Sequence, residues 1–284
     1  ITMEDLEEAI DRVVLGPARK GRILTDRVKE VYAYHEAGHA IVAHYLPNAM
    51  PVHKVTIIGR GMAGGYTQFL PDEDRGYLMT RSELMDELAT ALGGRAAEEL
   101  KFNEISTGAK GDLEQVTNMA RKMVMEWGMS DRLGPQAFGR PAEENIFLGR
   151  DIARDRNYSE EVAAAIDEEV GAIIEQAHKT AHQILQERWD ELVAVAEALM
   201  ERETLDRREF LEVIGEKELA EKEAAEEAQL AAKDAEGAET LDAAAVEAVE
   251  AGASGEDADG REAGEEREPM LEKGKHPKPA IGLE

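Results

Sequence analysis

The pentapeptide His35-Glu36-Ala37-Gly38-His39 lies inside a segment, residues 26–46, that has the pattern of a helix and stops before Pro47. Side chains four residues apart in a helix project from one face, one turn apart. Two imidazoles at that spacing can reach a single Zn²⁺, at about 2.0–2.1 Å per nitrogen. Zinc lowers the pKa of a water in its open position to about 7, and Glu36 lies one step round the helix, where its carboxylate can take the proton of that water. The pentapeptide therefore predicts a zinc site at which a bound water attacks a carbonyl group.

A pair of helical histidines satisfied by nearby carbonyl groups is the alternative to a metal site. Gly38 favours the metal, because a Gly inside a helix costs about 1 kcal/mol relative to Ala and usually marks a close approach to the backbone. A second pair at the same spacing, His178 and His182, provides an internal control. There Lys179 follows the first histidine, and Lys neither acts as a base on bound water nor tolerates a cation. We therefore interpret the second pair as ordinary packing or surface histidines.

A catalytic zinc takes a third protein ligand and keeps one position for water. The zinc-peptidase class with the sequence His-Glu-x-x-His-x-x-Gly-x-x-His is excluded, because Val42 and Tyr45 stand where its Gly and last His would fall. His44 is out of phase with the pair and His53 lies beyond the helix, so we interpret both as structural.

Acidic side chains remain as candidates for the third ligand. Glu98 and Glu99 follow Gly93-Gly94-Arg95 on a predicted helix, in an arrangement that resembles the distal Glu of another zinc-peptidase class. Asp112 follows a Gly-rich turn and opens the next predicted helix. It could instead be an N-cap that forms a capping box with Gln115. The spacing alone does not decide which of these acids is the third ligand.

Around this centre the sequence predicts a mainly α fold with a small sheet. Two strand-like runs, residues 52–59 and 66–69, are joined by glycines and predict a β-hairpin. The run 53–59 follows the helix of the pentapeptide, so we expect it to offer a free sheet edge that binds an extended substrate through main-chain hydrogen bonds. The other predicted helices cover roughly residues 2–15, 82–100, 112–127, 159–200 and 206–214.

The composition excludes several classes of function. The chain has 284 residues, no Cys, and 33 Lys and Arg against 61 Asp and Glu, for a net charge of −28. The absence of Cys excludes disulfides, thiolate metal sites and a Cys nucleophile. The negative charge argues against a nucleic-acid surface and against an anionic membrane face. No segment has the roughly 20 apolar residues that a membrane helix needs.

The charge is concentrated towards the C-terminus. Residues 216–284 contain 21 acidic and 8 basic side chains and no Phe, Trp or Tyr. Such a segment buries too little apolar surface to offset its ordering entropy, so we expect residues 215–284 to form a disordered acidic tail, with a solvated helix through about residue 233. Residues 23–214 are predicted to form the peptidase domain. The chain begins at Ile1 rather than Met, which suggests a piece of a longer protein.

Several ordered motifs carry a family resemblance. In sequence order they are His35-Glu36-Ala37-Gly38-His39, Leu92-Gly93-Gly94-Arg95-Ala96-Ala97-Glu98-Glu99, Ser106-Thr107-Gly108-Ala109-Lys110-Gly111-Asp112-Leu113, Trp127-Gly128-Met129-Ser130 and Phe147-Leu148-Gly149-Arg150. Over about residues 1–214 the chain resembles the peptidase domain of the FtsH family, the membrane-anchored, ATP-dependent zinc metalloproteases. The resemblance implies that Asp112 is the third zinc ligand. It makes Glu98 a local structural acid that remains the competing ligand.

The resemblance also implies a larger assembly. Residues 1–22 would be the final helix of the lid of an AAA+ ATPase and a linker, and the family forms homohexamers that enclose their proteolytic sites. ATP and Mg²⁺ are expected only for the upstream ATPase, because the present chain has no phosphate-binding loop and no nucleotide-binding residues. The full-length protein would work in protein quality control at the cytoplasmic side of the bacterial inner membrane, whereas the present chain is expected to be soluble.

The sequence thus favours a zinc endopeptidase that cleaves unfolded or translocated polypeptides. His35, His39 and Asp112 would bind Zn²⁺, and Glu36 would be the general base and then the general acid. The alternative from another class is a helical oligomerisation module in which zinc only staples helices together. Glu36 weighs against that module, because a purely structural site needs no base beside its ligands.

Overall fold

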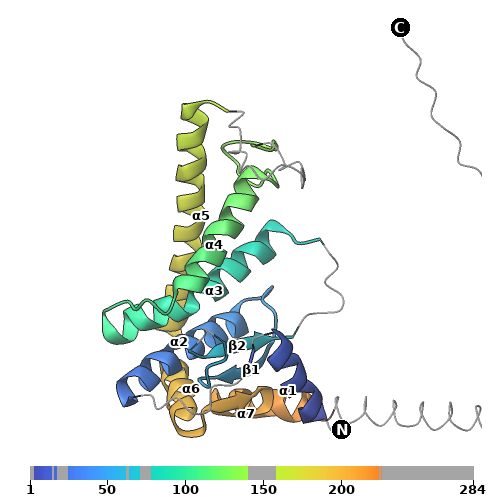
Figure 1. The fold of residues 1–284 in the computed structure, drawn as a ribbon, viewed down its shortest axis with the longest axis vertical. Helices are drawn as coiled ribbons and strands as arrows, with labels where there is room; N and C mark the ends of the chain where they lie inside the picture. Colours follow the sequence, from blue (N-terminus) through green and yellow to red (C-terminus); the bar gives the residue numbers. More distant parts are fainter. Residues whose placement is uncertain are drawn as a thin grey trace, which may run out of the picture. The chain divides into compact units, whose positions relative to one another are not determined.

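The computed structural model describes residues 3–14, 16–17, 25–61, 64–70, 78–139, 158–223 and 225. In this part of the chain the fold is mainly helical with one small antiparallel sheet, as the sequence predicts (Figure 1). The elements are α1 (Met3–Val14), α2 (Asp26–Tyr45), β1 (Val52–Thr56), β2 (Tyr66–Phe69), α3 (Arg81–Phe102), α4 (Lys110–Met125), α5 (Glu160–Glu187), α6 (Trp189–Arg202), β3 (Thr204–Asp206) and α7 (Arg207–Val213).

Helix α2 is the centre of the fold. Its residues are buried without interruption from Ala33 to Ala43, which is the pattern of a helix that is covered on every side. It packs against α3, α6 and the sheet. In Figure 1 the sheet and α7 lie below α2, and α3, α4 and α5 lie above it. The pentapeptide of the sequence analysis therefore sits between two layers.

Helices α2 and α3 approach each other closely where both carry a glycine. A Cβ atom on Gly38 would lie 2.4 Å from the carbonyl oxygen of Gly93, and a Cβ on Gly93 would lie 2.6 Å from the oxygen of Gly38. Real Cβ atoms do not come so near to a backbone, so only glycine fits at either position. The close approach that Gly38 predicted is confirmed, and Gly93 is its partner on α3.

The sheet differs from the predicted hairpin in one respect. Its strand order is β2-β1-β3, because the short strand β3 pairs antiparallel with β1 through Val55 and Leu205. Strand β1 is thus the central strand, and the expectation that residues 53–59 offer a free edge is wrong. Among the described strands, β2 and β3 form the two edges of the sheet. No pattern in the sequence predicts β3, since three residues are too few to show a strand period.

The predicted helix over residues 159–200 is two helices. Arg188 ends α5 and begins α6, with φ −113° and ψ 31°. The bend lets α5 pack on α3 while α6 packs on α2. Arg188 stacks over the ring of Tyr45 on α2 at 4.1 Å and pairs with Glu191 in the first turn of α6, so a contact from another helix and a local ion pair both hold the bend. The helical period continues through Arg188 and therefore conceals the break.

The domain boundary predicted at residues 214/215 remains a prediction, but the described residues beyond it pack on the fold. Residues 217–223 are helical, and Ala220 is buried. Glu223 forms an ion pair with Arg207, which also donates to the carbonyl oxygen of Val52. The acidic tail expected further on lies outside the described residues, apart from residue 225. No helix in the described ranges is both long and apolar enough to cross a membrane.

Candidate metal centre

Two helices, α2 and α4, bring His35, His39 and Asp112 together. The histidines come from the middle of α2, and Asp112 comes from the first turn of α4. The Nε2 atoms of His35 and His39 lie 3.1 Å apart, and Oδ2 of Asp112 lies 3.2 Å and 3.8 Å from them. Two ligands of a tetrahedral Zn²⁺ at about 2.0–2.1 Å are separated by roughly 3.3 Å. The three atoms are therefore spaced as zinc requires, and within the described residues they form the one such group.

The tautomers of both histidines follow from their other ring nitrogens. Nδ1 of His35 lies 2.7 Å from Oε1 of Glu98, and Nδ1 of His39 lies 2.8 Å from the carbonyl oxygen of Thr90. Both partners can only accept, so each Nδ1 donates a proton. In a neutral imidazole, Nε2 then carries a lone pair. Two such lone pairs and the carboxylate of Asp112 converge on one point, which is a site built for a cation.

The charges of the protein groups by themselves lead to the same conclusion. Burial lowers the pKa of His35, but its hydrogen bonds with Asp112 and Glu98 outweigh burial and raise that pKa to about 10. Burial, together with the positive charge of His35, lowers the pKa of His39 to about 4. Burial opposes ionisation of Asp112, but hydrogen bonding with His35 holds its pKa below the usual range. The group thus stabilises one positive charge between two imidazoles and a carboxylate.

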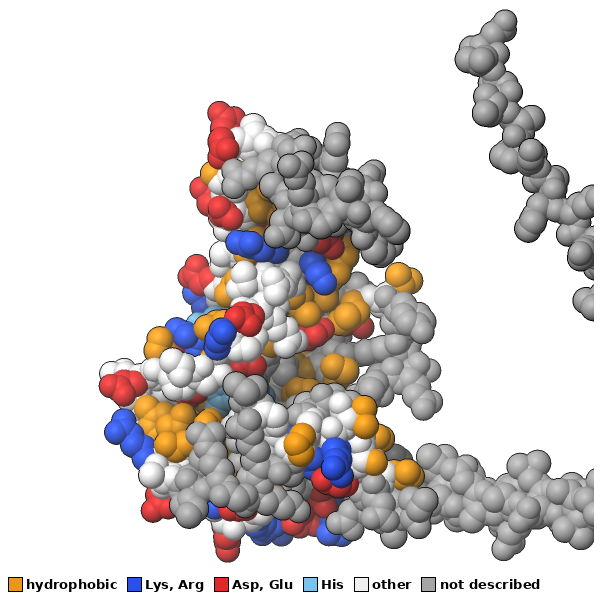
Figure 2. All heavy atoms as spheres, viewed as in Figure 1, with side chains coloured by type: hydrophobic (Ala, Val, Ile, Leu, Met, Phe, Trp, Pro, Cys, Tyr) orange, Lys and Arg blue, Asp and Glu red, His pale blue; other side chains and the backbone are white. Residues whose placement is uncertain are grey.

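Glu36 lies beside the ligand group and not within it. Its Oε2 accepts a hydrogen bond of 3.0 Å from the hydroxyl of Thr67 on β2. Burial raises the pKa of Glu36 to about 7, against the opposing effects of His35 and of the Thr67 hydroxyl. A carboxylate with a pKa near 7 can both accept and return a proton at neutral pH. The residues of the pentapeptide are largely covered: His35 and His39 are 7% and 8% exposed, and little pale blue is visible in Figure 2.

Gly94 makes room for the imidazoles. A Cβ at this position would lie 2.6 Å from the Nε2 atoms of both His35 and His39. Of the Gly93-Gly94 pair, the first residue therefore admits the backbone of α2 and the second admits its histidine rings. Gly94, Thr90 and Thr67 were not predicted from the sequence as parts of the site. The doubled glycine inside a helix was the one signal for the first of these, because glycine is unfavourable there.

The competing acids lie elsewhere. Glu98 contacts the Nδ1 side of His35, and its second oxygen accepts the N–H of Ser106 at 2.7 Å. Glu99 pairs with Arg95 and His178.

The structure also corrects the alternative interpretation of Asp112 as an N-cap. Helix α4 begins at Lys110 and its N-cap is Ala109, so Asp112 lies inside the first turn.

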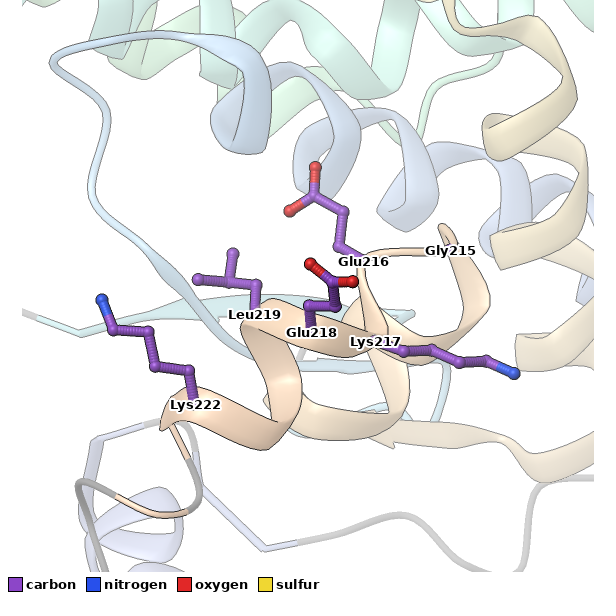
Figure 3. A pocket seen from close by; sticks show the side chains of 6 residues that line it. All are labelled: Gly215, Glu216, Lys217, Glu218, Leu219 and Lys222. Atoms are coloured by element: carbon purple, nitrogen blue, oxygen red, sulfur yellow. The ribbon is translucent and has the colours of Figure 1, made fainter.

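The histidines interpreted as structural include His44, which pairs with Glu216 at 3.2 Å and packs edge-on against Phe210. An open surface hollow lies near this end of the fold, lined by the residues labelled in Figure 3: Gly215, Glu216, Lys217, Glu218, Leu219 and Lys222. Its lining contains none of the candidate site residues and consists mainly of flexible charged side chains. The candidate site residues therefore lie where α2, α3 and α4 meet, and not at this hollow.

A buried helix with two converging histidines, an adjacent carboxylate and a third acidic ligand defines the class of this protein as a metallopeptidase of the His-Glu-x-x-His type. Comparison with known families is consistent with that class. The model of peptidase family M41 matches residues 22–213, and the chain belongs to this family.

Curated relatives give the same picture. Over 213 residues the chain is 59% identical to "ATP-dependent zinc metalloprotease FtsH 1" of Thermoanaerobacter sp. (strain X514), a match that covers 75% of this chain and 34% of the relative. It is 56% identical over 210 residues to the FtsH 1 protein of Sphaerobacter thermophilus, covering 74% and 32%. It is 56% identical over 216 residues to FtsH of Kosmotoga olearia, covering 76% and 33%. The chain thus spans about a third of the length of these relatives.

Proposed function

We propose that this chain is the zinc endopeptidase part of an ATP-dependent protease. His35, His39 and Asp112 would hold one Zn²⁺, and Glu36 would carry protons. The observation that carries the proposal is the convergence of two Nε2 atoms and one carboxylate oxygen at separations of 3.1–3.8 Å. The family match and the names of the relatives support zinc and peptide-bond hydrolysis.

A zinc ion held there would polarise the scissile carbonyl and acidify the attacking water. The protein's own residues perform the remaining steps. The Glu36 carboxylate accepts the proton of the attacking water and then delivers it to the nitrogen of the leaving amine. Thr67 holds one Glu36 oxygen by a hydrogen bond of 3.0 Å, so the carboxylate is oriented before substrate arrives. Burial, which raises the pKa of Glu36 to about 7, makes its carboxylate a stronger base for the proton of the water, and an acid with a pKa near 7 still releases that proton at neutral pH.

The substrate would be an extended polypeptide that pairs with the free edge of β2. Leu70 donates its N–H to Pro51 on the β1 side. Alternate residues of a strand turn their main-chain groups to the same side, so those of Phe69 and Thr67 face the free edge. Thr67 would thus connect substrate pairing on its main chain with Glu36 on its side chain. Pairing of this kind reads no side chains, which suits an enzyme for many unfolded substrates.

Substrate peptides that are N-methylated at single positions test the strand pairing. Methylation removes one N–H without changing the side chain. We expect alternate methylated positions near the cleaved bond to raise KM strongly, with little effect at the positions between them. A KM that is insensitive to methylation at every position would contradict the pairing.

The full protein would be larger. The relatives are about three times as long as the matched part, and their names state ATP dependence. We propose that an ATPase domain precedes residue 23, that the assembly is a homohexamer at the cytoplasmic side of the bacterial inner membrane, and that it removes unfolded proteins. Within the present chain, residues 1–22 would be the end of that ATPase and a linker, and residues 215–284 an acidic tail.

The rival proposal, a zinc-stapled oligomerisation module, has less support. A structural zinc site is closed by four protein ligands. The described residues bring three ligand atoms together, and the next acid, Glu36, is bonded to Thr67 instead of completing the group. Retention of zinc without any peptide hydrolysis would favour the rival.

Zinc content tests the proposal directly. Wild type and Asp112→Ala are reconstituted with zinc, freed of excess metal, and measured by elemental analysis beside a peptide-hydrolysis assay. We expect about one zinc per chain in wild type, a large loss in the variant, and hydrolysis only in wild type. Equal zinc in both proteins would remove Asp112 from the ligand set, and no bound zinc in wild type would overturn the proposal.

A further inference from the structure

The proposed ligands His35 and Asp112 lie on α2 and α4, which are not consecutive helices. One buried acid, Glu98, contacts both His35 and the segment that leads into α4. Glu98 on α3 is only 2% exposed. Its Oε1 lies 2.7 Å from Nδ1 of His35 on α2, and its Oε2 accepts the N–H of Ser106 at 2.7 Å. Ser106 lies in the connection that leads into α4. One carboxylate thus joins a ligand-bearing helix to the segment that delivers the other ligand.

The connection after Ser106 is tightly hydrogen-bonded up to α4. The Ser106 hydroxyl accepts the N–H of Gly108 at 3.0 Å, and Lys110 donates to the oxygen of Thr107. Helix α4 begins at Lys110, two residues before Asp112. Fixing Ser106 therefore fixes where the first turn of α4 starts, and with it the carboxylate of Asp112.

We propose that Glu98 is a positioning residue that couples the two halves of the metal site. It holds His35 in the tautomer whose Nε2 faces the metal, and it anchors the connection that places Asp112. This inference rests on the proposed function, because it presumes that His35 and Asp112 are zinc ligands. Glu98 itself touches neither metal nor substrate.

A carboxylate is the side chain that this position requires. Both of its partners are donors: a main-chain N–H at Ser106 and Nδ1–H at His35. A carboxylate offers two acceptor oxygens, whereas an amide of the same shape offers one acceptor and one donor group. Gln at position 98 can keep the Ser106 bond only if His35 moves its proton to Nε2, which removes the lone pair for zinc. Alternatively, Gln at this position can keep the hydrogen bond with His35 and lose the one with Ser106. Either outcome weakens the site.

The experiment compares Glu98→Gln with Glu99→Gln. Glu99 is the next residue on α3 and pairs with Arg95 and His178, away from the ligand group, so it is a matched control for the loss of one charge. Zinc affinity is measured by competition with a chelator, and thermal unfolding is followed beside it. We expect zinc binding about 10- to 100-fold weaker in Glu98→Gln, as for other groups that orient a metal-binding histidine, and unchanged affinity in Glu99→Gln.

A second readout reports the histidine itself. ¹⁵N NMR of the imidazoles distinguishes a proton on Nδ1 from one on Nε2. In zinc-loaded wild type we expect the Nδ1–H form of His35, and this measurement does not depend on the folding of any variant. An unprotonated Nδ1 on His35 in wild type would overturn the proposal, as would wild-type zinc affinity in Glu98→Gln.

The outcomes separate this inference from the proposed function. If wild type binds zinc, Asp112→Ala loses it, and Glu98→Gln retains full affinity, only the role of Glu98 fails. If wild type binds no zinc, the proposed function fails first. Equal weakening in Glu98→Gln and Glu99→Gln would indicate a general effect of charge and would also overturn the positioning role.

Discussion

The chain carries two histidine pairs with the same spacing along a helix, and the surroundings of the two pairs differ. His35 and His39 on α2 have ring centroids 4.7 Å apart, and their Nε2 atoms meet the carboxylate of Asp112. His178 and His182 on α5 have ring centroids 6.0 Å apart. There the acid that His178 faces is already paired with Arg95. Spacing along a helix therefore permits a metal site, but partners from other helices decide whether one forms.

Those partners differ in kind. In the first pair, each Nδ1 is held by an acceptor, Glu98 or the carbonyl oxygen of Thr90, so both Nε2 atoms converge. In the second pair, the rings are tilted by 53°, and the acid near His178, Glu99, forms an ion pair with Arg95. We infer from this difference that two histidines one turn apart form a metal site only when partners fix their tautomers and a further acid faces them.

The largest expected effect separates the two pairs directly. His39→Ala removes a ligand, so we expect loss of stoichiometric zinc and hydrolysis at background level, because two protein ligands hold zinc weakly. His182→Ala is the matched control at the second position of the other pair, and we expect it to keep both zinc and activity. Zinc content and peptide turnover are measured on both variants. Loss of zinc in His182→Ala would break the contrast between the pairs.

The next effect tests the residue that follows the first histidine in each pair. Glu36→Gln removes the proton acceptor but leaves the ligands, so we expect kcat/KM to fall by about 10²–10⁴ with zinc content unchanged. Lys179→Gln at the equivalent place on α5 breaks only an ion pair with Glu175 and should leave turnover unchanged. Steady-state kinetics and metal analysis decide, and retained turnover in Glu36→Gln would remove its catalytic role.

Glycines on the two helices give a smaller and opposite pair of effects. A Cβ on Gly38 of α2 would lie 2.4 Å from the oxygen of Gly93, so Gly38→Ala should destabilise the fold by about 1–3 kcal/mol. A Cβ on Gly171 of α5 would meet nothing within 4 Å, so Gly171→Ala should stabilise it by about 0.5–1 kcal/mol. Denaturant unfolding measures both. Stabilisation by both substitutions would show that helix propensity, and not packing, dominates at Gly38.

The smallest effect concerns pH. The Thr67 hydroxyl lowers the pKa of Glu36 by stabilising its ionised form, against burial, which raises that pKa to about 7. Hydrolysis needs ionised Glu36, so activity falls as pH drops through its pKa. Thr67→Val removes the hydrogen bond, and the acid limb of the kcat/KM profile should move to higher pH. On that limb the loss should be up to roughly tenfold, the worth of one hydrogen bond of about 1.4 kcal/mol. A limb that stays in place would exclude this role of Thr67.

Much of the site was predictable because its chemistry is local. The histidines and Glu36 lie on one turn of one helix, and helical geometry alone places them on neighbouring faces. Gly38 predicted a close approach to its backbone, since glycine is unfavourable inside a helix and usually marks such a contact. Asp112, 73 residues beyond His39 in the sequence, was implied only by the family resemblance, because no local pattern measures the distance between two helices.

The sequence by itself determined the mainly helical fold, and it predicted both the zinc chemistry proposed for the pentapeptide and the contrast with His178 and His182, because these depend on short-range periodicity and residue type. Tertiary structure alone decided three matters. It placed β1 in the centre of the sheet by adding β3, it bent the long helix at Arg188, and it set Glu98 at the Nδ1 side of His35, outside the group of His35, His39 and Asp112. Each depends on which elements pack together, and packing joins residues that are far apart along the chain.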